Sequence, residues 1–402
     1  MKINKNNNKF YHPLMKNNIS VSDSANVIKL LKRKDPILTQ NVNVKKFEKK
    51  WSEWLGIKYS VFVNSGSSAN FLTFAYLKTI LKKDDEVIVP TITWVSDIIS
   101  VLNNGFKPVF IDINLNNLAI AAEEIKKRIS KKTKVIFLTH VLGFNGLTNE
   151  IIKICKEKSI ILIEDVCESH GANFNKKKLG TYGLISNFSF YYAHHMTTIE
   201  GGMISTNSNK IYEILRMMRG HGMLREAENQ VLKNIYIKKY KNLNKDFIFL
   251  YPGYNFRSTE INAIMGINQL KRLNNNIKRR NINFKIFIDH IDKEKYFTKF
   301  DIEGISNYAF VIIFNQRYRN FKFRSRFEKK LIDNNIEFRR GTSGGGNQLR
   351  QPYLKYYNYN FQSYKKFINA EVVHNYGYYI GNYPELKRIQ ILKICNILNN
   401  IS

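Results

Sequence analysis

Short apolar runs alternate with stretches of helical periodicity between Gly56 and about residue 186. The apolar runs are rich in Val, Ile and Phe, and they cover residues 59–64, 85–90, 107–113, 133–143 and 160–169. Runs this short, separated by helical crossovers, predict parallel strands of one sheet that is covered by helices on both faces. We therefore expect an α/β fold whose ligands bind at the carboxyl ends of the strands.

The second half of the chain has a different pattern, with one long amphipathic helix predicted at 260–280. The other elements predicted in this half are two strands around a turn (188–193, 201–207) and a strand–helix–strand set (308–314, 323–336, 336–340). These elements predict a large domain over residues 26–274 and a small α+β domain over residues 275–402. Residues 1–25 are polar and rich in Asn and Lys, which predicts a flexible N-terminal arm of unassigned function.

Composition narrows the choice of partners and compartment. The chain has 64 Lys and Arg against 32 Asp and Glu, and its formal net charge is +32. The lysines are spread along the chain without interleaved stacking aromatics, so we expect a solvated basic surface and no nucleic-acid partner. No apolar run reaches the roughly 18 residues of a membrane span, and the N-terminus has no secretory pattern. Three distant cysteines predict neither disulfides nor a metal site and fit a reducing cytoplasm.

Four clusters that could carry chemistry fall at predicted strand ends. Residues 64–68, Asn-Ser-Gly-Ser-Ser, open a helix after a strand and could cradle a phosphate, although an ordinary helix cap also explains them. Trp94 follows the second strand and could stack on a planar ring, or simply belong to the core. Asp165 ends a very apolar run, where a carboxylate requires a positive partner such as a pyridinium nitrogen. The block 189–202, SFYYAHHMTTIEGG, carries two adjacent histidines.

In this order and spacing, the clusters resemble the sugar aminotransferase family of fold type I pyridoxal-phosphate enzymes. The motifs that carry the resemblance are SGSSAN, VPTITW, EDVCESHGA, SFYYAHHMTTIEGG and YPGYNFRSTEINAIMGINQLKRL. The resemblance implies a large cofactor-binding domain and a homodimer with shared active sites, in which Asn255 reaches the neighbour's cofactor phosphate. It implies that the remaining cofactor contacts come from Gly66, Ser67, Trp94, Asp165, Glu168 and Ser189.

The aligned block has His194 at the position where transaminases of this family keep the lysine that binds the cofactor. An imidazole cannot form the Schiff base that an ε-amine forms, but it can transfer protons near neutral pH. This substitution resembles a branch of the family, the 3-dehydratases of nucleotide-linked 4-keto-6-deoxy sugars, which serve deoxysugar, lipopolysaccharide and O-antigen biosynthesis. The implied reaction is loss of the sugar C3 hydroxyl, with pyridoxal or pyridoxamine phosphate as cofactor, L-glutamate as amino donor and His194 as the catalytic residue.

A second histidine-bearing group of that branch acts on a CDP-linked sugar and carries a [2Fe–2S] cluster. The loop after Gly202 has no cysteine, so we expect neither this cluster nor any metal. The nucleotide (GDP, CDP or dTDP), the sugar, the pathway product and the role of His195 stay open. Candidate substrate contacts are His221, Phe247, Arg257, Asn347 and Arg350.

Three alternatives remain at this stage. The first is an ordinary nucleotide-sugar aminotransferase with an unrecognised lysine. The second is a non-catalytic protein that binds a sugar or the cofactor on the same fold. The third is a protein that binds nucleic acid through its excess positive charge, which would show steeply salt-dependent affinity.

Overall fold

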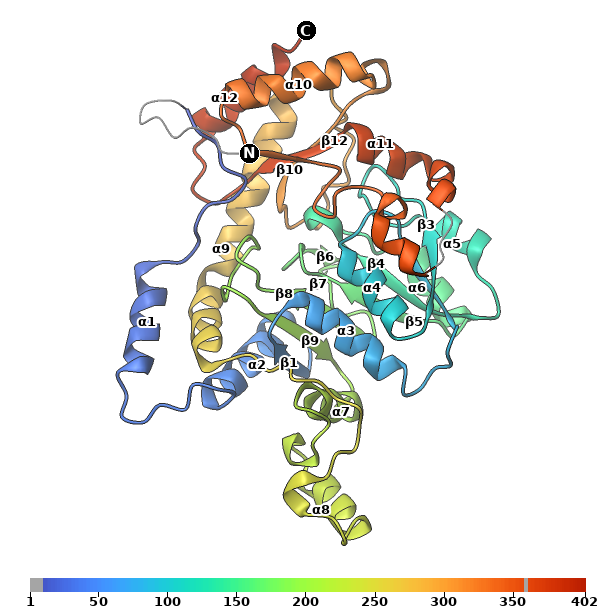
Figure 1. The fold of residues 1–402 in the computed structure, drawn as a ribbon. Coiled ribbons are helices and arrows are strands. Elements are labelled where there is room, and N and C mark those ends of the chain that lie inside the picture. Colours follow the sequence, from blue (N-terminus) through green and yellow to red (C-terminus); the bar gives the residue numbers. More distant parts are fainter. Residues whose placement is uncertain (1–9, 358–360) are drawn as a thin grey trace.

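The computed structural model describes residues 10–357 and 361–402, and a seven-stranded sheet lies at its centre (Figure 1). In spatial order its strands are β1 (Tyr59–Val63), β9 (Gly202–Thr206), β8 (Ile185–Ser189), β5 (Ile161–Asp165), β4 (Thr133–Thr139), β2 (Glu86–Pro90) and β3 (Lys107–Ile111). The pairs from β8 to β3 are parallel, and β9 is antiparallel to both of its neighbours. The predicted α/β class is confirmed.

Alternate residues of the strands point to opposite faces of the sheet, and each face has its own apolar cluster. Val87 and Val89 belong to one cluster, whereas Ile88 between them belongs to the other. Helices α3 (Gly66–Leu77), α4 (Val95–Asn103) and α7 (Asn209–Arg219) pack on the first face. Helices α2 (Val42–Leu55), α5 (Ala122–Arg128) and α6 (Asn149–Glu157) pack on the second. Burial on both faces explains why these strands read as continuous apolar runs.

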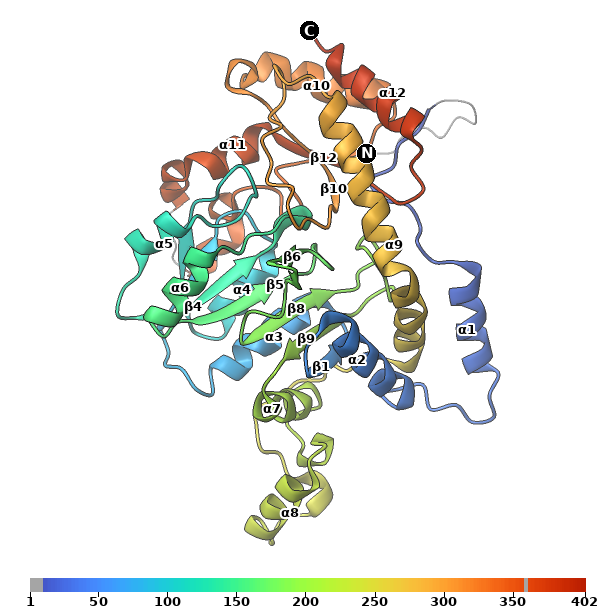
Figure 2. The same cartoon turned by 180° about the vertical axis from the view of Figure 1, so that it is seen from behind.

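Helix α9 (Glu260–His290) links the large sheet to a smaller one, and it is ten residues longer than the predicted 260–280. The smaller sheet has the order β10 (Ala309–Ile313), β12 (Gly377–Gly381), β11 (Phe338–Arg340), with all pairs antiparallel. Helices α10 (Phe321–Asp333), α11 (Ile368–Tyr376) and α12 (Arg388–Asn399) surround it (Figure 2). The predicted boundary at 274/275 lies inside α9, where the helix is continuous, so this division stays a prediction.

Part of the predicted flexible arm, residues 10–25, makes defined contacts with the small domain and with α9. His12 is buried and forms a bridge with Ile336, and α1 (Val21–Leu31) begins within the predicted arm. The side chain of Asp23, on α1, is fully enclosed by polar partners from α9. A polar sequence hid this packing because hydrogen bonds and an ion pair hold the segment, rather than an apolar face. Residues 1–9 lie outside the described part.

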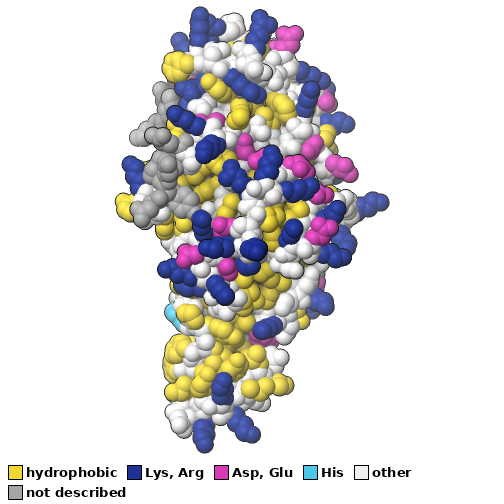
Figure 3. Space-filling model, turned by 90° about the vertical axis from the view of Figure 1, so that its right-hand side faces the viewer, with side chains coloured by type: hydrophobic (Ala, Val, Ile, Leu, Met, Phe, Trp, Pro, Cys, Tyr) yellow, Lys and Arg dark blue, Asp and Glu magenta, His cyan; other side chains and the backbone are white. Residues whose placement is uncertain are grey.

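An extension that carries α8 (Gln230–Lys239) projects from the body of the molecule below α7 (Figure 1). No residue of α8 is buried, and apolar side chains gather over this narrow end (Figure 3). Its exposed apolar residues are Val231, Ile235, Leu243, Phe247 and Phe249. Such a patch is typical of a surface that another protein covers.

Two features complete the described structure. Strands β6 (Asn173–Phe174) and β7 (Lys177–Lys178) form a short hairpin. Over residues 10–357 and 361–402, none of the helices combines the length and the apolar character needed to cross a membrane.

Candidate active site

The start of α3 meets the end of β8 at the carboxyl edge of the sheet. A Cβ atom added to Gly66 would lie 2.6 Å from Ser189 Cβ and 3.1 Å from Cys167 Sγ, so only glycine fits there. Ser65 caps the helix, because its Oγ accepts a hydrogen bond of 3.0 Å from the backbone N–H of Ser68. The start of α3 therefore lies against Ser189, and the exposed Ser67 follows Gly66 in its first turn. A helix N-terminus with close backbone approach is suited to bind a phosphate.

Asp165 ends β5 and is buried next to a second carboxyl group, that of Asp97. Its two oxygens accept hydrogen bonds of 2.8 Å from Asn70 Nδ2 and from the backbone N–H of Cys167. Burial and, next, the negative charge of Asp165 raise the pKa of Asp97 well above its ordinary value. This shift favours the neutral form of Asp97, and a carboxylate at Asp165 beside it would be the electrostatic partner that a pyridinium requires.

Trp94 and Glu168 flank this pair of carboxyl groups. Trp94 directly precedes α4, its side chain is 49% exposed, and the neighbouring Thr93 hydroxyl donates to Asp97. Glu168 accepts a hydrogen bond of 2.8 Å from the backbone N–H of Leu142. Burial raises the pKa of Glu168 to about 7, so this carboxyl group can exchange a proton near neutral pH.

His194 lies in the loop between β8 and β9, inside a cage of rings. The centroids of Tyr308, Tyr191 and His170 lie 5.6, 6.0 and 6.1 Å from that of its imidazole. Its Nδ1 is buried and has no hydrogen-bond partner in the described part of the chain. Burial and, to a smaller degree, the charge of Arg280 lower the pKa of His194 to about 3. The imidazole is therefore neutral at pH 7 and can accept a proton.

Asn255 and Arg257 lie beside the end of β1, close to the start of α3. Asn255 bridges Gly220, Arg257 bridges Val63, and the backbone N–H of Asn64 donates to the carbonyl of Phe256. Arg257 forms an ion pair of 2.7 Å with Glu226, so its charge is already matched.

The neighbouring His221 and Phe247 are less closely tied to this edge. The backbone N–H of His221 donates to the carbonyl of Tyr254, and its φ is +64°. The side chain of Phe247 is 54% exposed on the extension, where the guanidinium of Arg225 lies over its ring. The structure does not bring Phe247 to His194 within this chain.

The loop 347–350 of the small domain docks on the segment that carries Trp94. Asn347 bridges Ile92, and the backbone N–H of Gln348 donates 2.9 Å to the carbonyl of Thr91. Asn347 Nδ2 donates 3.0 Å to Glu371, and Arg350 pairs with the same carboxylate. Both predicted substrate residues therefore lie near the site, already engaged with Glu371.

Several residues of this site were missed by the sequence analysis. They are Asn70, Asp97, His170, Arg280 and Tyr308. Asn70 and Asp97 carried a usable signal, since each is a polar residue in an otherwise apolar helical stretch. Tyr308 carried none, because it directly precedes a strand of the small domain and only the fold brings it to His194. Over residues 10–357 and 361–402, no group of three or more His, Cys, Asp or Glu is arranged to hold a metal ion.

Known proteins resemble this chain in both sequence and fold. The pattern of the DegT/DnrJ/EryC1/StrS aminotransferase family matches residues 18–399. The GDP-4-keto-6-deoxy-D-mannose 3-dehydratase of Yersinia pseudotuberculosis is 34% identical, over 90% of this chain and 92% of its own length. The enzyme of the same name from Escherichia coli O55:H7 is 36% identical, over 86% of this chain and 89% of its own length. The solved structure of the E. coli enzyme with bound hydrated PLP superposes with a TM-score of 0.88 at 31% identity, covering 97% of this chain and 100% of that one. The chain belongs to the DegT/DnrJ/EryC1/StrS aminotransferase family and has its fold type I architecture.

Proposed function

We propose that this protein is a pyridoxal- or pyridoxamine-phosphate-dependent 3-dehydratase of GDP-4-keto-6-deoxy-D-mannose that uses L-glutamate as amino donor. The observation that carries the proposal is His194, whose pKa is lowered by burial and whose motif resembles the block in which transaminases of the family carry their cofactor-binding lysine. Two relatives named for this activity support it, and their names favour GDP over the CDP and dTDP left open by the sequence. The resemblance places the reaction in deoxysugar and O-antigen biosynthesis.

The residues present fit the cofactor. Gly66 packs so closely on Ser189 that a Cβ atom would not fit, and this contact brings Ser189 beside the start of α3, where a helix N-terminus is suited to bind a phosphate. The charged Asp165, supported by Asn70, fits the ring nitrogen, and Trp94 offers a half-exposed ring for stacking. When bound, the cofactor supplies an amine and an electron sink for the sugar carbons.

The protein's own groups supply proton transfer. His194 accepts and returns the proton as a neutral base beside the rings of His170, Tyr191 and Tyr308. Glu168, which titrates near neutral pH, is a second group able to exchange a proton at this edge. Asp165 would stabilise a positive charge on the ring nitrogen of the cofactor, which would support its role as an electron sink.

The alternative of an ordinary aminotransferase requires a lysine near His194. The lysines closest along the chain are Lys178, in the β6–β7 hairpin, and Lys210, an exposed residue of α7. Lys178 Nζ donates 2.6 Å to the carbonyl of Trp54 and lies over that residue's ring, outside the cage. Borohydride reduction and peptide mapping test this alternative: a cofactor trapped on any lysine would support transamination.

The decisive experiment measures release of ammonia with glutamate against a panel of GDP-, CDP- and dTDP-linked 4-keto-6-deoxy sugars. We expect turnover with the GDP-linked mannose derivative and loss of turnover in His194→Asn, with cofactor still bound. Activity retained by His194→Asn would remove its assigned role. Absence of turnover with the whole panel would favour a non-catalytic protein.

The active enzyme is, in this proposal, a cytoplasmic homodimer with shared sites. The apolar extension around Phe247 has no cover within the described chain, and Asn255 stands at the surface edge of the phosphate cradle. Free cysteines in the described chain fit a reducing compartment. If Asn255 serves the neighbour's site, mixing inactive Asn255→Ala and His194→Asn subunits should restore about a quarter of wild-type activity through mixed dimers with one intact site. No recovery would contradict shared sites.

A further inference from the structure

The N-terminal segment touches the loop of the histidine pair on its way from the small domain to α1. Asn18 Nδ2 donates a hydrogen bond of 3.2 Å to the backbone carbonyl of His195. This contact joins positions separated by 177 residues, and it reaches the residue next to His194. His195, whose role the sequence left open, is therefore the point where the segment and the candidate active site meet.

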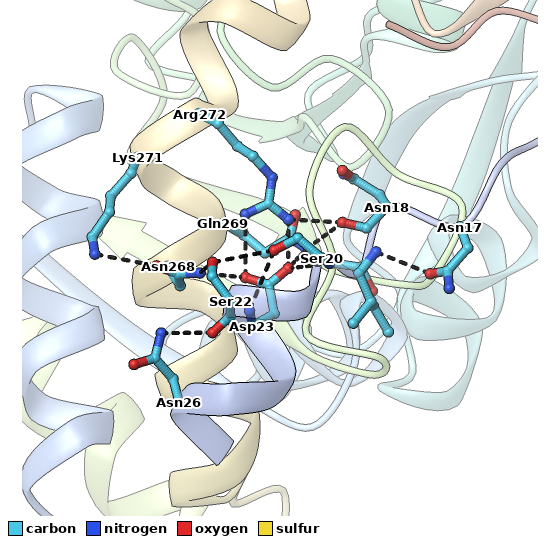
Figure 4. A network of polar contacts seen from close by, with 12 residues as sticks. Asn17, Asn18, Ser20, Ser22, Asp23, Asn26, Asn268, Gln269, Lys271 and Arg272 are labelled. Atoms are coloured by element: carbon cyan, nitrogen blue, oxygen red, sulfur yellow. Dashed lines mark hydrogen bonds and ion pairs between the residues drawn. The ribbon is translucent and has the colours of Figure 1, made fainter. Parts of the chain in front are cut away.

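Asn18 is itself held by helix α9. Its carbonyl accepts hydrogen bonds of 2.9 Å from Gln269 Nε2 and 2.7 Å from Arg272 Nη2. The same two side chains bind Asp23 Oδ2 at 3.0 and 2.5 Å, while Asn268 Nδ2 donates to Asp23 Oδ1 at 2.6 Å. Figure 4 shows these groups converging between α1 and α9, with Asn18 on the far side of Arg272 and Gln269 from α1. A buried carboxylate with this many partners is a rigid support.

The other end of the segment is fixed in the small domain. His12 donates from its backbone N–H to Asn335 and accepts from Glu337, both at 2.9 Å, in a bridge beside β11. Its ring Nε2 donates 2.8 Å to the carbonyl of Gly381 at the end of β12. Because His12 and Asp23 are both anchored, the chain between them can shift little, and Asn18 lies in that span.

The ring of His195 is held as firmly as its carbonyl. Its Nε2 lies 2.9 Å from the carbonyl of Ser306, to which it donates, and 3.1 Å from the Ser306 hydroxyl. Ser306 Oγ in turn donates 2.6 Å to the carbonyl of His170, whose ring is part of the cage around His194. The Nδ1 atoms of both histidines are buried without a hydrogen-bond partner in the described chain, so the ring of His195 is held through its Nε2.

We propose that Asn18 and His195 are positioning residues that fix the backbone beside His194, so that its imidazole holds one direction in the ring cage. The Nδ1 of His194 has no hydrogen-bond partner in the described chain that would set the direction of the ring, so the backbone must supply the constraint. The proposal rests on the proposed proton transfer by His194. It assigns no contact with cofactor or substrate to either positioning residue.

The test compares two neighbouring asparagines. Asn18→Asp has nearly the same shape as the wild type but removes the donor to His195, whereas Asn17→Ala removes a side chain whose Oδ1 accepts the local N–H of Ile19. We expect Asn18→Asp to lower kcat roughly ten-fold, through removal of the hydrogen bond and the added repulsion, with KM and cofactor affinity unchanged. Asn17→Ala should match the wild type. Equal kcat in the two variants would overturn the proposal.

A second pair of variants tests the ring. His195→Gln keeps an N–H donor that can reach Ser306, and His195→Leu does not. We expect His195→Gln to retain most of the kcat and His195→Leu to lose most of it. Of the two variants, only His195→Gln keeps a donor that can bind the carbonyl of Ser306. A drop in kcat to the same extent in both variants would contradict a positioning role.

Amide hydrogen exchange separates this proposal from the proposed reaction. Exchange of residues 193–196 should be faster in Asn18→Asp than in the wild type and Asn17→Ala, whatever substrate the protein takes. If the wild type releases no ammonia, the proposed reaction fails, but faster exchange still supports the positioning role. Unchanged exchange in Asn18→Asp overturns that role even in an active enzyme.

Discussion

Asp97 and Asp165 lie side by side in the buried edge of the sheet, where burial and the charge of Asp165 raise the pKa of Asp97 and favour its neutral form. We predict that replacing each by its isosteric amide has unequal effects. Both oxygens of Asp165 accept from N–H groups, namely those of Asn70 and Cys167. An amide there must turn its own NH₂ toward one of these donors, and it also removes the negative charge that the ring nitrogen needs.

Asp97 already carries a proton, so an amide resembles it closely. Its Oδ2 accepts from the hydroxyls of Thr93 and Thr139, and the amide oxygen of Asp97→Asn can do the same. The amide NH₂ then replaces the acid proton that faces Asp165. This variant therefore removes one hydrogen bond, which Asn70 Nδ2 donates to Asp97 Oδ1 at 2.7 Å in the wild type.

The magnitudes differ accordingly. Removing one partner of a buried charge pair costs about 3–5 kcal/mol, so Asp165→Asn should lower kcat/KM by roughly 150- to 5,000-fold. The single neutral hydrogen bond that Asp97→Asn removes is worth about 1 kcal/mol, or roughly five-fold. The assay combines cofactor titration by absorbance with glutamate-dependent release of ammonia. A decrease below ten-fold in Asp165→Asn, or equal decreases in both variants, would refute the assignment of charge.

Three further predictions concern stability, measured by urea unfolding. Burial lowers the pKa of His12 to about 4 and that of His194 to about 3, so the unfolded chain binds more protons below its ordinary histidine pKa of about 6.5. The contribution of each histidine to the unfolding free energy is complete above about pH 6.5 and falls on acidification by about 1.4 kcal/mol per pH unit. Equal urea midpoints at pH 7 and pH 5 would contradict this prediction. Glu260→Ala should lower the unfolding free energy by about 3 kcal/mol, since its carboxylate accepts three backbone N–H groups at the start of α2, with Glu260→Gln intermediate. Leu273→Ala, in the apolar cluster behind the sheet, should cost about 2–5 kcal/mol by opening a cavity, and an unchanged midpoint would argue against that packing.

The strands and the candidate site were predictable from the sequence to different degrees. Runs such as 160–169 predicted β5, because burial on both faces makes a strand visible as a continuous apolar run. The order of the strands was not predictable, since β1 pairs with β9 across about 140 residues of chain and periodicity records only local structure. Because periodicity records only local structure, it also gave no sign that Asp23, within the predicted arm, is buried against α9.

By itself, the sequence predicted the fold class and singled out His194, because the flanking motifs resemble the block in which transaminases of the family carry a lysine. The residue type alone excludes a Schiff base at that position. Only the tertiary structure decided the state of this histidine and what holds it. Its neutral charge comes from burial, its cage includes Tyr308 of the small domain, and its neighbour is fixed by Asn18. The contacts of Tyr308 with His194 and of Asn18 with His195 join segments more than 100 residues apart, and such contacts form only when the chain has folded.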